Sequence, residues 1–107
     1  MVSALTSAIS GLRDASMRVD VAANNIANLN TEKFTPSRVV SEEAPGGGVA
    51  TTVTPSVAAP PDPPPSSGTD LATEMMNLIV AKLAFAASAR VISTASELDR
   101  TALDALG

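Results

Sequence analysis

The chain has 107 residues, a formal net charge of -4, and neither Cys nor His, which excludes disulfides, thiol nucleophiles, imidazole bases and the common zinc sites. Apolar residues make up 45% of the sequence but aromatic residues only 2%, so each residue can bury little surface and a thick self-contained core is not expected. Acidic and basic residues are interspersed without a basic stripe, and no apolar run is expected to be long enough to span a membrane, so we expect neither nucleic acid binding nor membrane insertion.

The first predicted element is a long helix from Val2 to about Leu29, where apolar residues follow a heptad spacing. One series is Val2, Ile9, Ser16 and Ala23, and the other is Leu5, Leu12, Val19 and Ile26. This spacing puts side chains on a narrow seam that packs against another helix. The opposite face carries Arg13, Asp14, Arg18 and Asp20. This mixed-charge face would be directed either to solvent or to a partner, and we expect solvent.

Four asparagines mark the end of this helix: Asn24, Asn25, Asn28 and Asn30. Asn is a poor residue inside a helix, because its side chain competes for backbone hydrogen bonds, but it caps helix ends well. The residues alone leave two interpretations open, a frayed helix end or a motif that makes specific contacts, either within the chain or with another molecule.

The middle of the chain reads as extended. Pro36 confirms the helix break, and residues 37–41 and 49–54 are rich in β-branched side chains, so that they can form a short β-hairpin around the turn at Gly46–Gly48. Residues 55–68 contain most of the prolines and predict a polyproline-II connector. A linker is favoured over an SH3-type ligand, because no flanking Arg or Lys fixes a docking direction.

The last predicted element is a second long helix, which Thr69 or Asp70 would cap. Its apolar residues form two neighbouring stripes. One contains Leu71, Met75, Leu78, Phe85, Ala89, Ile92, Leu103 and Leu106, and the other Met76, Ile79, Leu83, Val91, Ala95, Leu98 and Ala102. One intramolecular partner cannot cover both stripes, so the surplus surface should meet other molecules.

No residue pattern indicates catalysis or ligand binding. The serines have no His or Cys partner, the triple glycine is not followed by Gly-Lys-Ser or Gly-Lys-Thr, and the adjacent Glu42 and Glu43 do not form a calcium loop. We therefore predict that the protein is not an enzyme and has no cofactor, metal or catalytic residues.

Two segments resemble the bacterial flagellar axial proteins, which form the rod, hook and hook-filament junction. Residues 7–12 and 22–31, with the core Ala-Asn-Asn-Ile-Ala-Asn, are similar to the N-terminal rod motif of that family. Residues 70–79, 84–85 and 91–98 are similar to its C-terminal motif. Lys33 stands where the family usually has the Gly of a Thr-x-Gly-Tyr/Phe turn. The short middle segment is most like that of the proximal-rod class.

The resemblance implies that the terminal helices pair as a coiled coil in the inner wall of a hollow axial structure. It also implies export through the flagellar type III apparatus without signal cleavage, in agreement with the absence of a Sec-type pattern in residues 1–6. The implied partners are copies of the chain, other rod or axial proteins and the export apparatus. The implied location is the periplasmic rod of the basal body.

The sequence therefore predicts an all-α fold, in which two long terminal helices form an antiparallel coiled-coil hairpin joined by an extended Pro/Gly-rich segment that can include a short β-hairpin. Residues 1–31 would be the N-terminal rod helix, 32–68 the connector and 69–107 the C-terminal rod helix. The predicted helix-end motif is Asn24, Asn25, Asn28 and Asn30. The predicted subunit-packing residues are Leu5, Ile9, Leu12, Val19, Ile26, Leu71, Met75, Leu78, Phe85, Ile92, Leu98 and Leu103.

The predicted function is that of a self-assembling structural subunit of the flagellar basal-body rod. The alternative is a soluble helical-hairpin adaptor that binds one partner helix with fixed stoichiometry. A rod subunit should self-associate and co-purify with basal bodies, whereas an adaptor should be a monomer or a closed dimer.

Overall fold

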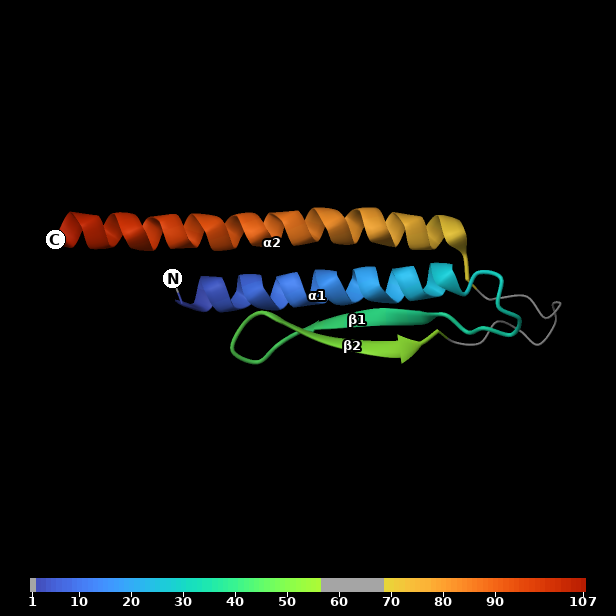
Figure 1. Ribbon diagram of the computed structural model, residues 1–107. Helices are drawn as coiled ribbons and strands as arrows, with labels where there is room; N and C mark the ends of the chain where they lie inside the picture. The colour runs from blue at the N-terminus through green and yellow to red at the C-terminus, as the bar shows by residue number, and fades with distance from the viewer. Residues whose placement is uncertain (1, 57–68) are drawn as a thin grey trace.

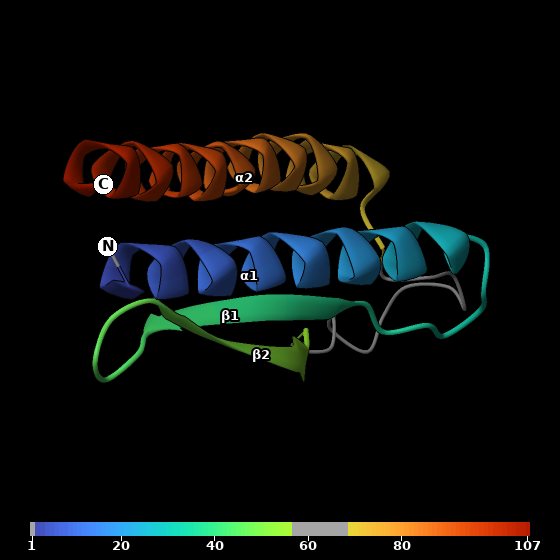
Figure 2. The same cartoon turned by 60° about the vertical axis from the view of Figure 1, so that its left-hand side comes forward.

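The computed structural model describes residues 2–56 and 69–107 and is drawn in Figure 1. The chain forms helix α1 (Val2–Ala27), strands β1 (Ser37–Glu43) and β2 (Val49–Pro55), and helix α2 (Leu71–Leu106), in that order. Figures 1 and 2 show α1 in the middle, with α2 along one side and the two strands along the other. Within the described residues, α1 contacts all three other elements and α2 contacts only α1. The molecule is thus an elongated body of three layers, with extents of 69 × 25 × 14 Å.

The all-α prediction is wrong, because the segment between the helices forms an antiparallel β-hairpin. β1 and β2 pair over their whole length, from Ser37 opposite Pro55 to Glu43 opposite Val49. Their β-branched residues favour strands, and α1 supplies the packing partner that a two-stranded hairpin needs in water. The hairpin itself was predicted and is confirmed. The helices are nevertheless not a self-contained coiled-coil hairpin, since α1 packs on two sides instead of along one seam.

The two helices run antiparallel (Figure 1) and meet along a face of small residues. Gly11 lies opposite Ser88, whose hydroxyl oxygen would be only 3.0 Å from a Cβ added at Gly11, and Asn25 lies opposite Glu74. Among the described residues, the buried apolar side chains are all alanines: Ala8, Ala15, Ala22, Ala81 and Ala95. Alanine lets helix backbones approach closely but buries little apolar surface. The α1–α2 contact is therefore close and only weakly stabilising for its length.

The Asn25 side chain of α1 bonds the backbone of β1 at its first residue, on the edge where a third strand would otherwise pair. The Ser56 N–H donates to the Pro36 carbonyl at 2.8 Å, so the alternation of an antiparallel ladder turns the backbone N–H and C=O of Ser37 away from β2. Asn25 bonds both groups, because its Nδ2 donates to the Ser37 carbonyl at 2.8 Å and its Oδ1 accepts from the Ser37 N–H at 3.0 Å. The amide thus satisfies a strand edge that would otherwise be open.

The glycine turn at the other end of the hairpin lies against the first turns of α1. Gly46, Gly47 and Gly48 have φ values of 89°, 102° and 82°, in the region that glycine adopts without strain. Ser10 Oγ accepts a hydrogen bond from the Val49 N–H at 3.0 Å, and a Cβ on Gly48 would come within 2.5 Å of that oxygen. Glycine at position 48 is therefore required both by its φ and by the close approach of α1.

The start of α2 and the turn that follows α1 are both determined by nearby residues. Of the two predicted caps, Thr69 and Asp70, it is Asp70 that caps α2, since its side chain accepts from the backbone N–H of Ala72 at 3.1 Å and of Thr73 at 3.3 Å. Lys33 has a φ of 58°, so it adopts the left-handed conformation for which a glycine is usual. The turn after α1 thus keeps a glycine-like backbone although a lysine stands there. The polyproline-II connector predicted for residues 55–68 lies, apart from Pro55 and Ser56, outside the described residues.

Candidate assembly surface

Helix α2 exposes an unusual amount of apolar side chain. Ile79 is 63% exposed and Leu83 is 71% exposed, although residues of these types are usually buried. The exposed apolar surface of α2, as we define it, consists of Met76, Ile79, Val80, Leu83, Val91 and Leu98. Within the described part of the chain only α1 contacts α2, and it covers a different side of the helix. The surface extends along most of a 36-residue helix, which is about 54 Å long at 1.5 Å per residue.

The residues predicted to pack between subunits fall into two groups. Half-buried are Leu5, Leu12, Val19, Ile26, Leu78 and Ile92. Exposed are Ile9, Leu71, Met75, Phe85, Leu98 and Leu103. The first group is partly used within the subunit, whereas the second is available to another chain. Their role in subunit packing stays a prediction.

Apart from Ala95, which belongs to the second predicted stripe, the rows of residues that pack α1 on α2 were not identified from the sequence. In α1 they are Ala8, Ala15 and Ala22, and in α2 they are Glu74, Ala81, Ser88 and Ala95. Both rows repeat every seven residues beside the rows of larger side chains. Their strict spacing was therefore a usable signal, which the greater hydrophobicity of the neighbouring rows masked.

Asn25 joins three elements of the fold. Its side chain is fully buried, at 0% exposure, and besides its two bonds to Ser37 its Nδ2 donates to Glu74 Oε1 at 2.9 Å. Glu74 is itself buried and lies in the first turn of α2. One amide thus connects the end of α1 to the start of β1 and to the start of α2. For Asn25, the open question of the asparagine cluster is answered, because its partners are in its own chain.

The other asparagines shape the turn that follows α1, which ends at Ala27. Asn28 Nδ2 donates to the Asn24 carbonyl at 2.9 Å, and the Thr31 hydroxyl donates to Asn28 Oδ1 at 3.1 Å. Asn24 and Asn30 are exposed. The cluster therefore contains one buried junction, Asn25, and a set of surface residues around it.

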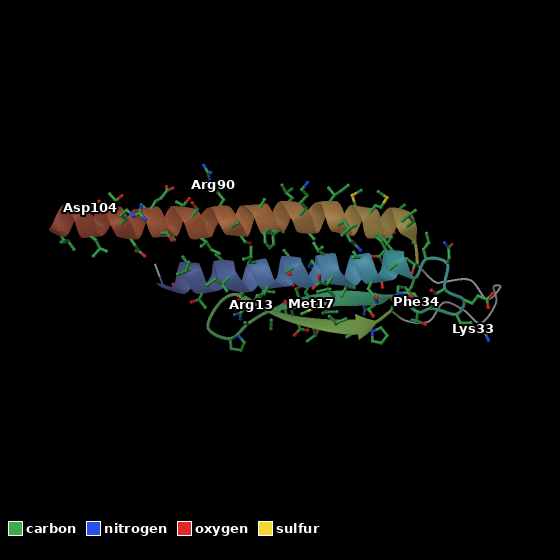
Figure 3. All side chains as sticks on the ribbon, in the orientation of Figure 1. Arg13, Met17, Lys33, Phe34, Arg90 and Asp104 are labelled. Atoms are coloured by element: carbon green, nitrogen blue, oxygen red, sulfur yellow. The ribbon has the colours of Figure 1, made fainter. Side chains whose placement is uncertain are left out.

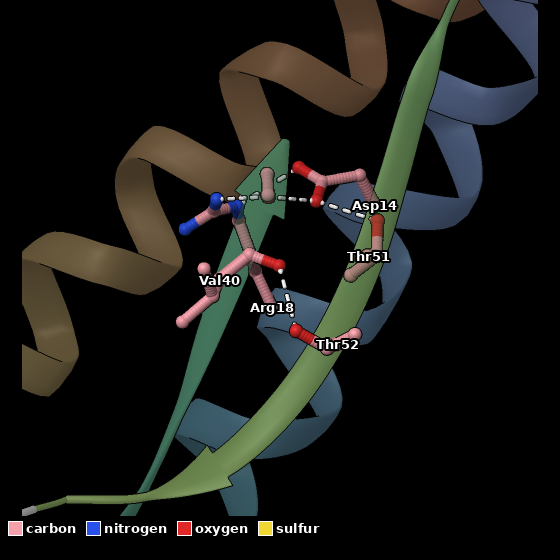
Figure 4. A network of polar contacts seen from close by, with 6 residues as sticks. Asp14, Arg18, Val40, Thr51 and Thr52 are labelled. Atoms are coloured by element: carbon pink, nitrogen blue, oxygen red, sulfur yellow. Dashed lines mark hydrogen bonds and ion pairs between the residues drawn. The ribbon is translucent and has the colours of Figure 1, made fainter. Parts of the chain in front are cut away.

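Asp14 and Arg18 connect α1 to the hairpin (Figure 4), so the expectation that they face solvent is wrong. Arg18 Nε lies 2.9 Å from Asp14 Oδ2, and the hydroxyls of Ser41 and Thr51 both donate to Asp14 Oδ1, Thr51 at 2.9 Å. Since Ser41 and Thr51 face each other on the two strands, one carboxylate holds both strands. Burial raises the pKa of the Asp14 carboxyl. The hydrogen bonds and the Arg18 charge together lower this pKa by more than burial raises it, so that it lies below its ordinary value of 3.8.

A groove of about 350 Å³ lies between the first turns of α2, the last turns of α1 and the start of β1. Its apolar lining consists of Val21, Ala22, Val39 and Val80, and Arg38 and Asn77 are among its polar residues. We call it the α2–β1 groove. Across the described residues, no group of three or more His, Cys, Asp or Glu side chains is placed to bind a metal ion.

By length and composition alone, α2 could cross a membrane, which corrects the expectation that no apolar run is long enough. Lys82 and Arg90 lie in the middle of this helix, and Figure 3 shows Arg90 pointing away from α1. Each charged side chain at the centre of a membrane helix costs about 2.5–3.5 kcal/mol. These charges favour a protein over lipid as the cover of this surface.

An elongated chain with paired terminal helices, one of which leaves its apolar surface uncovered, has the features of a structural subunit that assembles with other chains. Residues 5–35 match the family described as flagella basal body rod protein, and residues 66–105 match the family described as flagellar basal body rod FlgEFG protein C-terminal. The chain belongs to the flagellar basal-body rod family. The two matches include most of α1 and nearly all of α2. No curated protein matches the chain.

Membership of this family places the chain among the structural proteins of the flagellar basal body, which associate with other axial proteins and do not catalyse a reaction.

Proposed function

We propose that the chain is a structural subunit of the flagellar rod, and that neighbouring axial subunits pack on the exposed apolar surface of α2. The observation that carries this proposal is the contrast within one molecule, where α1 is covered on two sides and α2 on one. The partners are copies of the chain and other rod proteins, joined by helix-on-helix packing. Such contacts are heterologous and can repeat along an axis without closing.

The energetics favour several neighbours over a single one. Fully burying one large apolar side chain contributes about 1.5–3 kcal/mol, and the six residues of this surface are already partly buried, so covering all of them would contribute roughly 5–10 kcal/mol. Association costs about 4–15 kcal/mol in lost freedom and ordering. One contact of this kind is therefore marginal, whereas a rod lets each subunit contact several others at once.

Replacing Leu83 with Asp tests the proposal, because Leu83 is 71% exposed and its loss should not disturb the subunit itself. We expect Leu83→Asp to lower the amount of the chain in purified basal bodies by at least about tenfold, since a charge would be buried in the interface. Ser93→Asp, at an exposed position of the same helix, adds the same charge and should be incorporated like the wild type. Normal incorporation of Leu83→Asp would overturn the proposed packing surface.

The choice of Leu83 separates assembly from folding. Leu12 and Ile26 also belong to the predicted packing set, but both are half-buried, so an Asp at either position would disturb the subunit as well as its contacts. A chain that is absent from basal bodies and forms a monomer or closed dimer in solution would support the adaptor alternative instead.

We further propose that the chain reaches the periplasmic rod through the flagellar type III export apparatus without loss of a signal peptide, and that it belongs to the proximal-rod class. The sequence resemblance and the short segment between α1 and α2 support this assignment. The intact mass of the chain recovered from basal bodies tests the first point. A mass that lacks an N-terminal segment would contradict it.

A further inference from the structure

Helix α2 extends past α1 at the end of the molecule where both chain termini lie (Figure 1). The antiparallel register that pairs Gly11 with Ser88 and Asn25 with Glu74 places the start of α1 level with Glu97. Within residues 2–56 and 69–107, no helix therefore lies beside residues 98–106. We call these residues the overhang.

The overhang continues the side of α2 that packs on α1. Ala102 follows Ala95 at the seven-residue spacing of the packed row, and Leu103 and Leu106 are 69% and 86% exposed. Asp99 lies on this face, four residues after Ala95, whereas Figure 3 shows Asp104 on the side of α2 away from α1. The overhang thus presents a helix surface of the kind that α1 covers elsewhere, with net negative charge.

The α2–β1 groove lies toward the opposite end of the molecule and has complementary character. Val21, Val39 and Val80 supply apolar lining. Of the charged lining residues, Arg18 is paired with Asp14 and Glu74 is buried against Asn25, whereas Arg38 adds an exposed positive charge. Within residues 2–56 and 69–107, the one ion pair joins Arg18 to Asp14, so the Arg38 charge is available to an acidic partner.

We propose that the overhang of one copy lies in the α2–β1 groove of the next copy, with Asp99 near Arg38. This inference rests on the proposed function and identifies one of its contacts. Because the two surfaces lie toward opposite ends of a molecule 69 Å long, the contact is head-to-tail and can repeat into an open chain of subunits. A stable complex buries about 800 Å² of accessible surface on each partner, and a helix end of nine residues buries less than that. The contact is therefore weak in dilute solution and strengthened where other neighbours hold the subunits in line.

Introduced cysteines test this contact cleanly, because the chain has none of its own. The double variant Asn77→Cys with Leu103→Cys places one thiol at the groove and one on the overhang. Within one copy these positions lie about 39 Å apart along α2 at 1.5 Å per residue, far beyond the Cα separation of about 7 Å that a disulfide permits. A disulfide between them must join two copies.

We expect oxidation of the concentrated double variant to give a ladder of dimers, trimers and longer oligomers on non-reducing gels. Each single variant should stop at the dimer, because it has one thiol per copy. Thr101→Cys combined with Asn77→Cys is the matched control, since position 101 lies on another side of the overhang, and it should give at most about a tenth of the ladder. A second pair, Val80→Cys with Leu106→Cys, repeats the test at two other exposed positions.

Charge reversal tests the pairing of Arg38 with Asp99. Arg38→Glu and Asp99→Arg, each added to the cysteine pair, should lower the yield of the ladder about threefold to tenfold, and the two together should restore it. Absence of a ladder from both cysteine pairs, in solution and in isolated basal bodies, would overturn the head-to-tail contact. If the wild-type chain were still found in basal bodies, the rod proposal would stand. A ladder in solution from a chain that is absent from basal bodies would keep the contact and overturn the rod proposal.

Discussion

The two helices of this small molecule are both long, but they have very different surroundings. Helix α1 lies between α2 and the hairpin, and its buried side chains are alanines and one asparagine. Among the described elements, α2 is covered by α1 alone and leaves large apolar side chains such as Ile79 and Leu83 exposed. The chain therefore holds itself together through α1 and offers α2 to other molecules.

The two helices also differ in the kind of contact they make. α1 holds the hairpin mainly by polar groups, with Asn25 and Ser10 at the strand edges and Asp14 between them. Such contacts depend on exact geometry and leave unsatisfied buried groups when one partner is lost. Apolar packing on α2 is tolerant of the neighbour's identity. Substitutions in α1 should thus change the folding of the subunit, and substitutions on the outer surface of α2 should change its assembly.

The largest effect is expected from Asn25→Ala, because Asn25 holds both neighbours of α1. The change removes three hydrogen bonds and leaves the Glu74 carboxylate and the Ser37 backbone without these partners. We expect it to lower the free energy of unfolding by about 3–5 kcal/mol, measured by urea unfolding followed by circular dichroism. Asn24→Ala, at an exposed position of the same turn, should stay within about 0.5 kcal/mol of the wild type. Equal effects of the two changes would contradict the role of Asn25 as a junction.

A smaller effect is expected from Gly48→Ala, which disturbs α1 only on its hairpin side. The added Cβ would meet Ser10 Oγ at 2.5 Å, at a position where φ is 82°. We expect the free energy of unfolding to fall by about 2–3 kcal/mol, because left-handed strain and a steric clash act together.

Gly46→Ala separates these two causes. Gly46 has a φ of 89° but no atom within 4 Å of an added Cβ, so its replacement should cost only the backbone strain of about 1–2 kcal/mol. A Gly48→Ala variant no less stable than Gly46→Ala would show that α1 does not restrict the turn.

The elements that the sequence predicted correctly are those with local signals. Pro36 and the glycines at 46–48 bounded the hairpin, and Asp70 marked the start of α2. The all-α prediction was wrong because it treated the hairpin as part of a connector that does not pack on the helices. In the structure the hairpin is a third layer, and it packs on the α1 face that was expected to be solvated.

The sequence also indicated the exposed apolar surface, since two stripes on one helix exceed what a single neighbour can cover. It did not indicate the polar junctions. Asn25 and Glu74 are 49 positions apart, and Ser41 lies 27 positions from Asp14, so the partners leave no periodic pattern in either segment. At Lys33 the backbone conformation followed the turn and not the residue type.

The smallest change in stability is expected from Asp14→Asn, which affects only the hairpin side of α1 and whose effect depends on pH. Asp14→Asn removes the carboxylate that accepts hydrogen bonds from Ser41 and Thr51 and pairs with Arg18. We expect it to lower the free energy of unfolding near neutral pH by about 1 kcal/mol. Because the pKa of Asp14 in the folded chain lies below its ordinary value of 3.8, the stabilisation by the carboxylate is fully present above that pH and is lost as pH falls through the folded pKa.

The difference in unfolding free energy between the wild type and Asp14→Asn should therefore be widest near neutral pH and narrow below about pH 4. Urea unfolding between about pH 7 and about pH 3 measures it, and Asp20→Asn, at an exposed position of α1, controls for the loss of one negative charge. Hydrogen exchange adds the spatial test, since Asp14→Asn should speed exchange in β1 and β2 more than in α2, which does not contact the hairpin. Two results would contradict the role of the Asp14 carboxylate in holding the hairpin on α1. One is a difference in unfolding free energy that stays constant over the pH range, and the other is a hydrogen exchange rate that rises equally in all elements.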